Sequence, residues 1–140
     1  MYQFQLIAAQ KMEIILPFLQ LLNPDLSPLI IKKRLNDMLA NGYQCLGVFE
    51  HEKLIGICGI RILHKIYVGK HIEPDNVIIH PDYRNKGIGE KMMQWVAQFA
   101  KENNCEALEL NAYLSNEKGR KFWEENKYIA LGVHFQKKIQ

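Results

Sequence analysis

Residues 77–89 read Val77-Ile78-Ile79-His80-Pro81-Asp82-Tyr83-Arg84-Asn85-Lys86-Gly87-Ile88-Gly89, and this segment decides the fold. The run from about His71 to His80 predicts a strand, which Pro81 and Asp82 close. Apolar residues then recur at helical spacing from Gly87 to Asn104. A strand therefore runs into a helix through a short turn, and two glycines mark the start of the helix.

The start of this helix has the properties of an anion site. The first N–H groups of a helix have no partner within it, and the helix dipole favours negative charge at that end. Gly87 and Gly89 let the backbone approach a ligand closely, and Arg84 and Lys86 add positive charge. The segment predicts binding of a pyrophosphate; the alternative is that the glycines only let the helix pack closely on a strand. Neither GxxxxGKS/T nor GxGxxG is present, which excludes a P-loop and a dinucleotide fingerprint.

Length and composition bound the rest. A chain of 140 residues, 48% hydrophobic and 24% charged, fits one globular domain, residues 1–140. A net charge of +3 without a long basic run argues against nucleic acid as the main partner. No apolar stretch reaches the roughly 20 residues that span a bilayer, so we expect a cytoplasmic protein with no membrane partner. Three scattered cysteines, Cys45, Cys58 and Cys105, predict buried free thiols and neither disulfides nor a metal site.

Working outward from residues 77–89, the periodicity predicts a mixed α/β order of elements. Further strands are expected at Tyr2–Ala8, Gln44–Glu50, Leu54–Leu63, Ala107–Asn111 and Tyr128–Lys138. Further helices are expected at Gln10–Leu22, at Pro28–Ala40 and at Ser115–Asn126. Pro17 should kink the first of these helices, and Ser27 should cap the second.

A second segment, residues 116–128, adds to the pattern of residues 77–89. It contains Asn116, Gly119, Phe122, Trp123, Glu124 and Tyr128. The GCN5-related N-acetyltransferases (GNAT family) usually have Asn, Ala, an apolar residue, Tyr, Glu and Phe there, after a cofactor motif of apolar strand, Pro, an acidic residue, Tyr and Arg-x-x-Gly-x-Gly. The chain resembles this family from about Gln44 to its C-terminus. The resemblance implies an α/β (α+β) fold with a mixed, mostly antiparallel sheet, flanked by about four helices and splayed at the acetyl-CoA site.

The resemblance also implies acetyl-CoA as co-substrate and gives the matching positions their roles. The main chain of Val77, Ile78 and Ile79 would bond the pantetheine arm and the acetyl carbonyl, as an added strand bonds a sheet edge. The amides of Asn85, Lys86, Gly87, Ile88, Gly89 and Glu90 would hold the pyrophosphate, with Arg84 and Lys86 near the phosphates. Asn116 would bond the pantetheine arm; its alternative role is to cap the following helix.

Acetyl transfer to an amine needs a base, because an amine is protonated at neutral pH. Glu73 and Asp75 are the candidates, since they lie two apart on the predicted strand and share one face near the expected acetyl position. In the resembled family an acidic residue on this strand often has that role. The alternative is that both are ordinary solvated carboxylates at a strand start interrupted by Pro74. His71 and His80 are either proton relays or structural histidines.

The residue expected to protonate the leaving thiolate differs from the one that the family commonly has. The family commonly has a tyrosine that protonates the thiolate, whereas this chain has Trp123, and an indole N–H is a very poor acid. Three alternatives follow. Tyr113 or Tyr128 supplies the proton to the thiolate, and Tyr128 is our candidate. Otherwise water supplies it, or the chain catalyses the transfer poorly. Lys127 also replaces the usual glycine before Tyr128, and Asn126 is expected to form the left-handed turn there.

The acceptor is expected in the variable parts of the chain, which are the two N-terminal helices, residues 51–53 and residues 62–72. That last stretch is basic through His64, Lys65, Lys70 and His71. We therefore expect the primary amine of a small molecule that carries phosphate, phosphonate or carboxylate. Two other classes stay open: an acyl-CoA-binding regulatory module with little transferase activity, favoured by Trp123, and a protein N-acetyltransferase. The resemblance also allows a homodimer.

Overall fold

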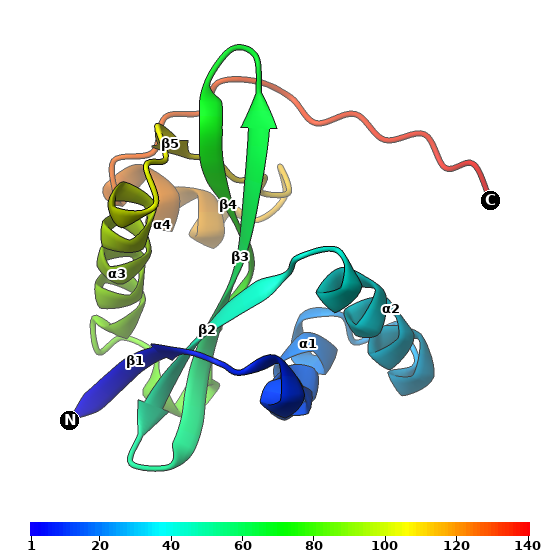
Figure 1. The fold of residues 1–140 in the computed structure, drawn as a ribbon, viewed down its shortest axis with the longest axis vertical. Helices are drawn as coiled ribbons and strands as arrows, with labels where there is room; N and C mark the ends of the chain where they lie inside the picture. Colours follow the sequence, from blue (N-terminus) through cyan, green and yellow to red (C-terminus); the bar gives the residue numbers. More distant parts are fainter. The chain divides into compact units, whose positions relative to one another are not determined.

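A five-stranded sheet with the order β1-β2-β3-β4-β5 forms the centre of the first of two units, Met1–Glu109 and Leu110–Gln140 (Figure 1). The structure is a computed structural model that describes residues 1–140. The strands are β1 (Tyr2–Leu6), β2 (Gln44–Glu50), β3 (Lys53–Lys65), β4 (Gly69–Ile79) and β5 (Ala107–Leu108). β1 to β4 pair antiparallel, and β5 pairs parallel with β4. The mixed, mostly antiparallel sheet is confirmed.

Of the two predicted N-terminal helices, the first is divided in the structure and the second begins as predicted. The first is divided into a 3-10 helix, η1 (Ala9–Ile15), and α1 (Leu16–Leu22). Pro17 lies in the first turn of α1, where its missing N–H costs no hydrogen bond, so the α-helix begins there. The second, α2 (Pro28–Ala40), begins as predicted, because the Ser27 hydroxyl accepts a hydrogen bond from the Ile30 N–H at 3.3 Å.

These helices cover one face of the sheet. Cys45 on β2, Ile57 on β3 and Ile78 on β4 point to that face and form a buried cluster with residues of η1, α1 and α2, which are Met12, Ile15, Phe18, Leu19, Ile31 and Leu35. Neighbouring residues along a strand point to opposite faces, so Leu46 and Cys58 face the other side. Figure 1 shows α3 (Ile88–Glu102) on that other side of the sheet.

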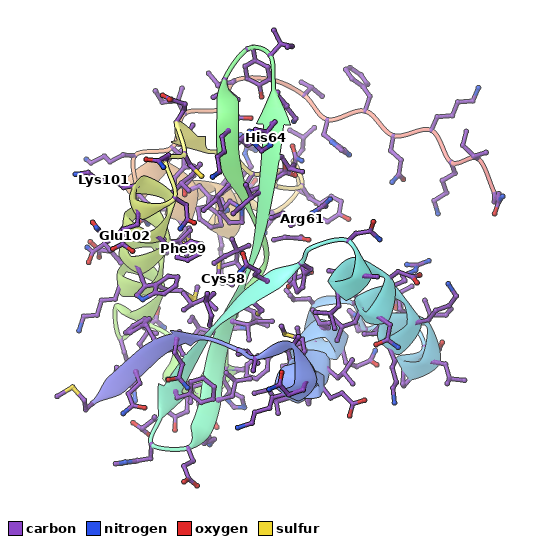
Figure 2. All side chains as sticks on the ribbon, viewed as in Figure 1. Cys58, Arg61, His64, Phe99, Lys101 and Glu102 are labelled. Carbon is purple, nitrogen blue, oxygen red and sulfur yellow. The ribbon has the colours of Figure 1, made fainter.

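Helix α3 presents one apolar stripe. Its buried residues recur at helical spacing and are Ile88, Met92, Met93, Val96 and Ala100. Trp95 and Phe99 stack beside this stripe with ring centroids 5.2 Å apart. Figure 2 labels Phe99 together with Lys101 and Glu102, which are exposed residues of the last turn of α3. The burial of this stripe fixes α3 and therefore fixes its N-terminus beside the end of β4.

The second unit, Leu110–Gln140, contains α4 (Glu117–Glu125). The predicted strand Tyr128–Lys138 is wrong, because these residues form no strand. Their apolar side chains do alternate, and yet Ile129, Leu131, Val133 and Phe135 are between 64% and 89% exposed. An alternating pattern becomes a strand only when a neighbouring strand satisfies its N–H and C=O groups. This unit contains no second strand to do so.

The structure describes the cysteines, the possible metal ligands and the length of the helices. Cys45 and Cys58 are buried free thiols as predicted, while Cys105 is also free but only half-buried. No cluster of His, Cys, Asp or Glu side chains has the geometry of a metal site. None of the helices combines the length and the apolar content that crossing a bilayer requires.

Candidate active site

A bulge interrupts β4 between the two predicted bases and the predicted cofactor strand. The register with β3 jumps between the pairs Ile57–Ile78 and Gly59–Asp75. Asn76 lies in the bulge with φ of 54°, in the left-handed region that asparagine tolerates better than most residues. Its side-chain amide donates a hydrogen bond to the Tyr43 hydroxyl at 3.3 Å. The bulge shifts the alternation of side chains, so Asp75 and Ile78 point to the same face although three residues separate them.

Gly59 makes room for this arrangement on the facing strand. A Cβ atom at Gly59 would lie 2.3 Å from the Tyr43 hydroxyl and 2.5 Å from the Asp75 carbonyl oxygen. Any side chain there would push Tyr43 or β4 away. The sequence showed neither Tyr43 nor Asn76 as a site residue, because their contact joins positions that are far apart along the chain.

Beyond the bulge, one edge of β4 is open. Strand β5 pairs with β4 only at His71 and Ile72, and no other strand of the Met1–Glu109 unit pairs with this edge. The His80 N–H donates to the Ile55 carbonyl at 2.7 Å, so that group points to β3. Because main-chain groups alternate along an antiparallel strand, those of Val77 and Ile79 point to the open edge, and those of Ile78 point to β3. A strand with such an edge can accept an extended ligand as an added strand.

The turn after β4 leads the chain into α3 through two left-handed residues. Asn85 has φ of 62° and Gly87 has φ of 74°, and Gly87 occupies the N-cap position without a side chain that caps the helix. No atom lies within 4 Å of a Cβ atom built on Gly87. The first N–H groups of α3, at Ile88, Gly89 and Glu90, have no partner within the helix, and no side chain at the N-cap position accepts from them. This is the geometry of an anion-binding helix start.

Arg84 and Lys86, the two predicted cations, have different positions. The Arg84 side chain turns back, and its Nε donates to the Ile79 carbonyl at 3.1 Å, which ties the turn to the end of β4. The Lys86 Nζ lies 5.3 Å from the centre of the Tyr83 ring. Lys53, from the hairpin between β2 and β3, places its Nζ at the same distance, 5.3 Å, from that ring. Sequence reasoning did not single out Lys53, because nothing local links it to Tyr83.

Tyr83 itself is held by a carboxylate of the sheet. Its hydroxyl donates to the Glu50 Oε1 at 2.9 Å, and this hydrogen bond raises the pKa of Tyr83. His80 caps the short 3-10 helix η2 (Pro81–Tyr83) because its Nδ1 accepts the Asp82 N–H at 3.2 Å. A ring nitrogen that accepts a main-chain N–H carries no proton of its own. The geometry gives His80 a structural role.

The predicted bases lie on one face of β4, as the spacing indicated. Glu73 is opposite Arg61 of β3, and Asp75 is opposite Gly59. The Asp75 carboxylate lies close enough to raise the pKa of Tyr43 and of Cys58, although burial is the larger cause for both groups. Burial likewise raises the pKa of Cys45 to about 12. Tyr43 and the two buried thiols are therefore neutral at physiological pH, which excludes a thiolate nucleophile in this part of the chain.

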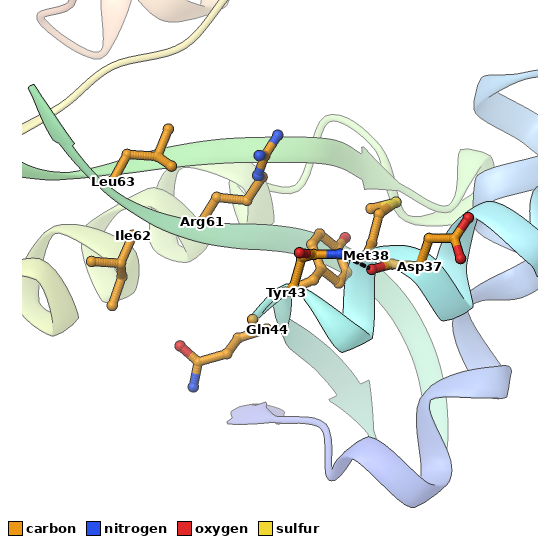
Figure 3. A pocket seen from close by; sticks show the side chains of 9 residues that line it. Asp37, Met38, Tyr43, Gln44, Arg61, Ile62 and Leu63 are labelled. Carbon is orange, nitrogen blue, oxygen red and sulfur yellow. Dashed lines mark hydrogen bonds between the residues drawn. The ribbon is translucent and has the colours of Figure 1, made fainter.

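A hollow of about 390 Å³ opens beside this face, between the C-terminal end of α2 and the part of β3 that extends beyond β2 (Figure 3). Arg61, Ile62 and Leu63 line it from β3, and Asp37, Met38 and Tyr43 line it from α2 and the turn after it. Asp37 is paired with Lys33 at 3.1 Å. The Arg61 guanidinium has no hydrogen-bond or ion-pair partner, so it is the free charge of the hollow.

The remaining predicted residues belong to the second unit. Asn116 caps α4, because its Oδ1 accepts the Gly119 N–H at 3.0 Å, and a Cβ atom at Gly119 would lie 2.4 Å from the Asn116 Nδ2. Gly119 therefore gives room to the cap. The Tyr128 N–H donates to the Trp123 carbonyl at 3.0 Å, and their rings lie 5.2 Å apart. Tyr113 is 84% exposed.

The predicted left-handed turn before Tyr128 is one residue further along the chain. Asn126 has φ of −91°, whereas Lys127 has φ of 71°. The Asn126 side chain instead donates to the Phe122 carbonyl at 2.8 Å, which keeps Asn126 attached to the last turn of α4. The prediction for Asn126 is wrong, because this hydrogen bond leaves the reversal of the chain to Lys127.

Comparison with known proteins agrees with this geometry. The sequence matches the acetyltransferase (GNAT) family over residues 12–128. A ribosomal-protein-alanine N-acetyltransferase from Brucella melitensis biovar Abortus 2308 superposes with a TM-score of 0.81 at 22% identity, covering 99% of this chain and 100% of that one. Aminoglycoside N-acetyltransferase AAC(6')-Iy in complex with CoA superposes with a TM-score of 0.85 at 13% identity, covering 100% and 96%. A predicted acetyltransferase with acetyl-CoA from Clostridium acetobutylicum gives 0.78 at 16% identity, covering 99% and 97%. No curated protein matches the sequence.

An open strand edge followed by an uncapped, glycine-marked helix start can bind an extended ligand with a phosphate group, and the fold is that of solved acetyltransferases. The chain belongs to the acetyltransferase (GNAT) family, and it is an acetyl-CoA-dependent enzyme. The residues fit this co-substrate, because the edge of β4 offers main-chain partners to an extended arm and the start of α3 offers free N–H groups to phosphates.

Proposed function

We propose that the enzyme acetylates the primary amine of a small anionic molecule, with acetyl-CoA as donor. The open edge of β4 beside the uncapped start of α3 carries this proposal. The main chain of Val77 and Ile79 would hold the pantetheine arm, and the amides from Asn85 to Glu90 would hold the pyrophosphate. Acetyl-CoA supplies the acetyl group as a thioester. The acceptor supplies the amine, and the protein supplies the base for the amine.

The hollow beside Arg61 supports an anionic acceptor. Its volume of about 390 Å³ is within the range of small-molecule sites. Arg61 is the cross-strand partner of Glu73, so a guanidinium for an anion and a carboxylate for an amine are neighbours on one face. An acceptor that carries carboxylate, phosphate or phosphonate a few bonds from its amine would satisfy both groups.

Glu73 and Asp75 are our candidates for the base that takes the proton of the acceptor ammonium. Their side chains share one face of β4, and Arg61 on the neighbouring strand β3 is the cross-strand partner of Glu73. Asp75 lies beside Tyr43 and Cys58, which are neutral because burial raises the pKa of each group. Glu73 is 21% exposed, so an acceptor can reach its carboxylate from solvent. We assign Glu73 as the first choice for the base and Asp75 as the second.

The second unit completes the proposal. Asn116 would contribute to the pantetheine arm through its Nδ2, because its Oδ1 is engaged in the helix cap. Tyr128 would protonate the leaving thiolate in place of Trp123. We further propose that the two units act as one acetyltransferase domain in the cytoplasm, where the free thiols Cys45, Cys58 and Cys105 stay reduced.

A thiol-release assay tests the function with pairs of amines that differ in one anionic group. Suitable pairs are an amino acid and its amide, an amino-sugar phosphate and the free amino sugar, and an aminophosphonate and its neutral alkylamine. We expect the anionic member of at least one pair to be acetylated more efficiently. Arg61→Gln should raise the KM of that member about tenfold and leave its neutral partner unchanged, because a charge-assisted hydrogen bond is lost. Lys101→Gln, which removes an exposed positive charge on α3, is the matched control.

Three results would decide against the proposal. Binding of acetyl-CoA in calorimetry with no thiol release from any amine would indicate a regulatory module. Labelling of peptide N-termini or lysines only would indicate a protein N-acetyltransferase. Equal rates for both members of every pair, unaffected by Arg61→Gln, would remove the anionic acceptor but keep the transferase.

A further inference from the structure

His71 on β4 is a polar residue that the core buries completely, with 0% of its surface exposed. It is paired with Ala107 at the short stretch where β5 joins β4. Glu73 follows it by two residues and points to the same face. A buried imidazole thus lies directly behind the carboxylate that the proposed function uses as its base.

The hydrogen bond of one ring nitrogen fixes one proton of His71. Nδ1 lies 3.1 Å from the main-chain carbonyl oxygen of Gly69. A carbonyl oxygen only accepts, so Nδ1 must carry a hydrogen and donate it. In a neutral ring the other nitrogen, Nε2, would then present a lone pair.

Two carboxylates face that second nitrogen. Nε2 lies 4.0 Å from Glu73 Oε2 and 3.9 Å from Glu109 Oε1, and it is buried without a hydrogen-bond partner. A neutral ring would aim a lone pair at two negative groups in a buried place, which is unfavourable. A protonated ring would instead aim an N–H at both, and each carboxylate would gain an opposite charge.

The other polar groups around the cluster agree with a positive ring. The Tyr67 hydroxyl, from the turn between β3 and β4, donates a hydrogen bond to Glu109 and so keeps Glu109 an acceptor. Arg61 on β3 is the cross-strand partner of Glu73, and Leu63, the cross-strand partner of His71, is apolar. The His71 ring is therefore the group that lies between Glu73 and Glu109, while Arg61 is the cross-strand partner of Glu73 and Tyr67 contacts Glu109.

We propose that His71 is a positioning residue: as a buried imidazolium between Glu73 and Glu109, it holds the Glu73 carboxylate in place on the face of β4 that Glu73 shares with Asp75. The role of Glu73 as base rests on the proposed function. In that step one proton leaves the acceptor ammonium for a carboxylate oxygen of Glu73, and His71 keeps its own two protons. Glu109 offsets the charge of the ring, so the cluster of two carboxylates and one imidazolium keeps a net negative charge that favours an ammonium.

Nitrogen NMR of the full chain tests the charge of the ring without any assay of activity. In the 15N-labelled protein at pH 7, the His71 ring should show both nitrogens protonated. Glu73→Gln and Glu109→Gln should each make the ring lose its Nε2 proton at a lower pH than in the wild type. A neutral ring at pH 7, or no change in either variant, would overturn the proposal even if the enzyme proved fully active.

The pH–rate profile then tests the positioning role. His71→Gln keeps an N–H donor without the charge, and it should lower kcat/KM about 10- to 100-fold and move the acidic limb of the profile to higher pH. The affinity for acetyl-CoA should stay unchanged. His134→Gln applies the same change to an exposed histidine outside the expected acceptor region and should have no effect. A charged ring in NMR with an unchanged rate profile in His71→Gln would also overturn the proposal.

Failure of the proposed function has a different signature. A wild-type protein that acetylates no amine would remove the role of Glu73 as base. The NMR titration would still show whether His71 holds a charge between Glu73 and Glu109. If it does, the crosslink between β4 and the segment after β5 should appear as a loss of stability in His71→Leu, measured by urea unfolding, that Glu109→Gln in the same chain partly relieves.

Discussion

The side-chain amide of Asn76 donates a hydrogen bond to the hydroxyl of the buried Tyr43 at 3.3 Å, and this contact joins the bulge of β4 to the turn between α2 and β2. The bulge lies between Asp75, which faces the charged side of the site, and Val77, whose main chain faces the open edge. One hydrogen bond thus fixes the position of the predicted base region relative to the predicted cofactor strand. The first prediction concerns the backbone that this contact supports.

Asn76→Gly and Asn76→Ala should differ in stability, because both lose the amide but only alanine resists a φ of 54°. We expect the alanine variant to be less stable than the glycine variant by about 1 kcal/mol in urea unfolding. Asn36 is an exposed residue of α2, and there the same pair of substitutions should give the opposite order, with alanine more stable by about 1 kcal/mol. Equal stabilities at position 76 would show that the left-handed backbone is not maintained in solution.

The second prediction concerns pH and the buried thiol of Cys45. Burial raises its pKa from 9.0 to about 12, so the folded state resists ionisation that the unfolded state undergoes freely. Stability from this group is complete below pH 9 and is lost as the pH rises from 9 towards 12. In urea unfolding between pH 7 and pH 10.5, the free energy of unfolding should fall less steeply with pH in Cys45→Ala than in the wild type. Cys105→Ala controls for the loss of a thiol, and an identical decline in Cys45→Ala would contradict the prediction.

Sequence reasoning found those features whose signal is local. The order of elements as far as α4, the cap at Ser27 and the helix start at Gly87 each depend on a few consecutive residues, and the structure has them where the sequence indicated. The family motif added the co-substrate. Glu73 and Asp75 share a face because a strand alternates side chains, which the spacing alone predicts.

Features that join distant parts of the chain were not predictable in this way. Lys53 and Lys86 meet at Tyr83, and Asn76 meets Tyr43, across separations that no local pattern encodes. The bulge at Asn76 was hidden because its left-handed residue is an asparagine and not a glycine. The strand predicted at Tyr128–Lys138 shows the converse: its alternation is clear, but alternation does not supply the neighbouring strand that its main chain requires.

The third prediction tests the charge that the hairpin adds to the cofactor site. Lys53 lies 5.3 Å from the Tyr83 ring, which also holds Lys86. Lys53→Met should raise the Kd for acetyl-CoA about two- to fivefold at low salt, the size of an exposed charge interaction, and the effect should shrink at high salt. Lys65→Met, on the opposite end of β3, should leave the Kd unchanged. Calorimetry that found no difference between the two variants would exclude Lys53 from the site.

The fourth prediction tests the start of α3 itself. Gly89 is the second residue of α3, in the turn whose free N–H groups are expected to meet the pyrophosphate. Gly89→Trp should abolish acetyl-CoA binding by covering these groups, while circular dichroism and the unfolding midpoint stay near the wild-type values. Gln94→Trp places the same large side chain on an exposed position further along α3 and should bind normally. Undiminished binding in Gly89→Trp would refute the cofactor assignment.

The fifth prediction concerns the proton for the leaving thiolate, which the indole of Trp123 is too weak an acid to supply. If Tyr128 is the acid, Tyr128→Phe should lower kcat about 100-fold with little change in the affinity for acetyl-CoA. Trp123→Tyr returns a phenol to the position where the family commonly has one, and in the Tyr128→Phe background it should recover part of the lost rate. Tyr113→Phe is the matched control, because Tyr113 is 84% exposed. Stopped-flow thiol release separates the chemical step from product release, and an unchanged kcat in both Tyr128→Phe and Tyr113→Phe would leave water as the proton source.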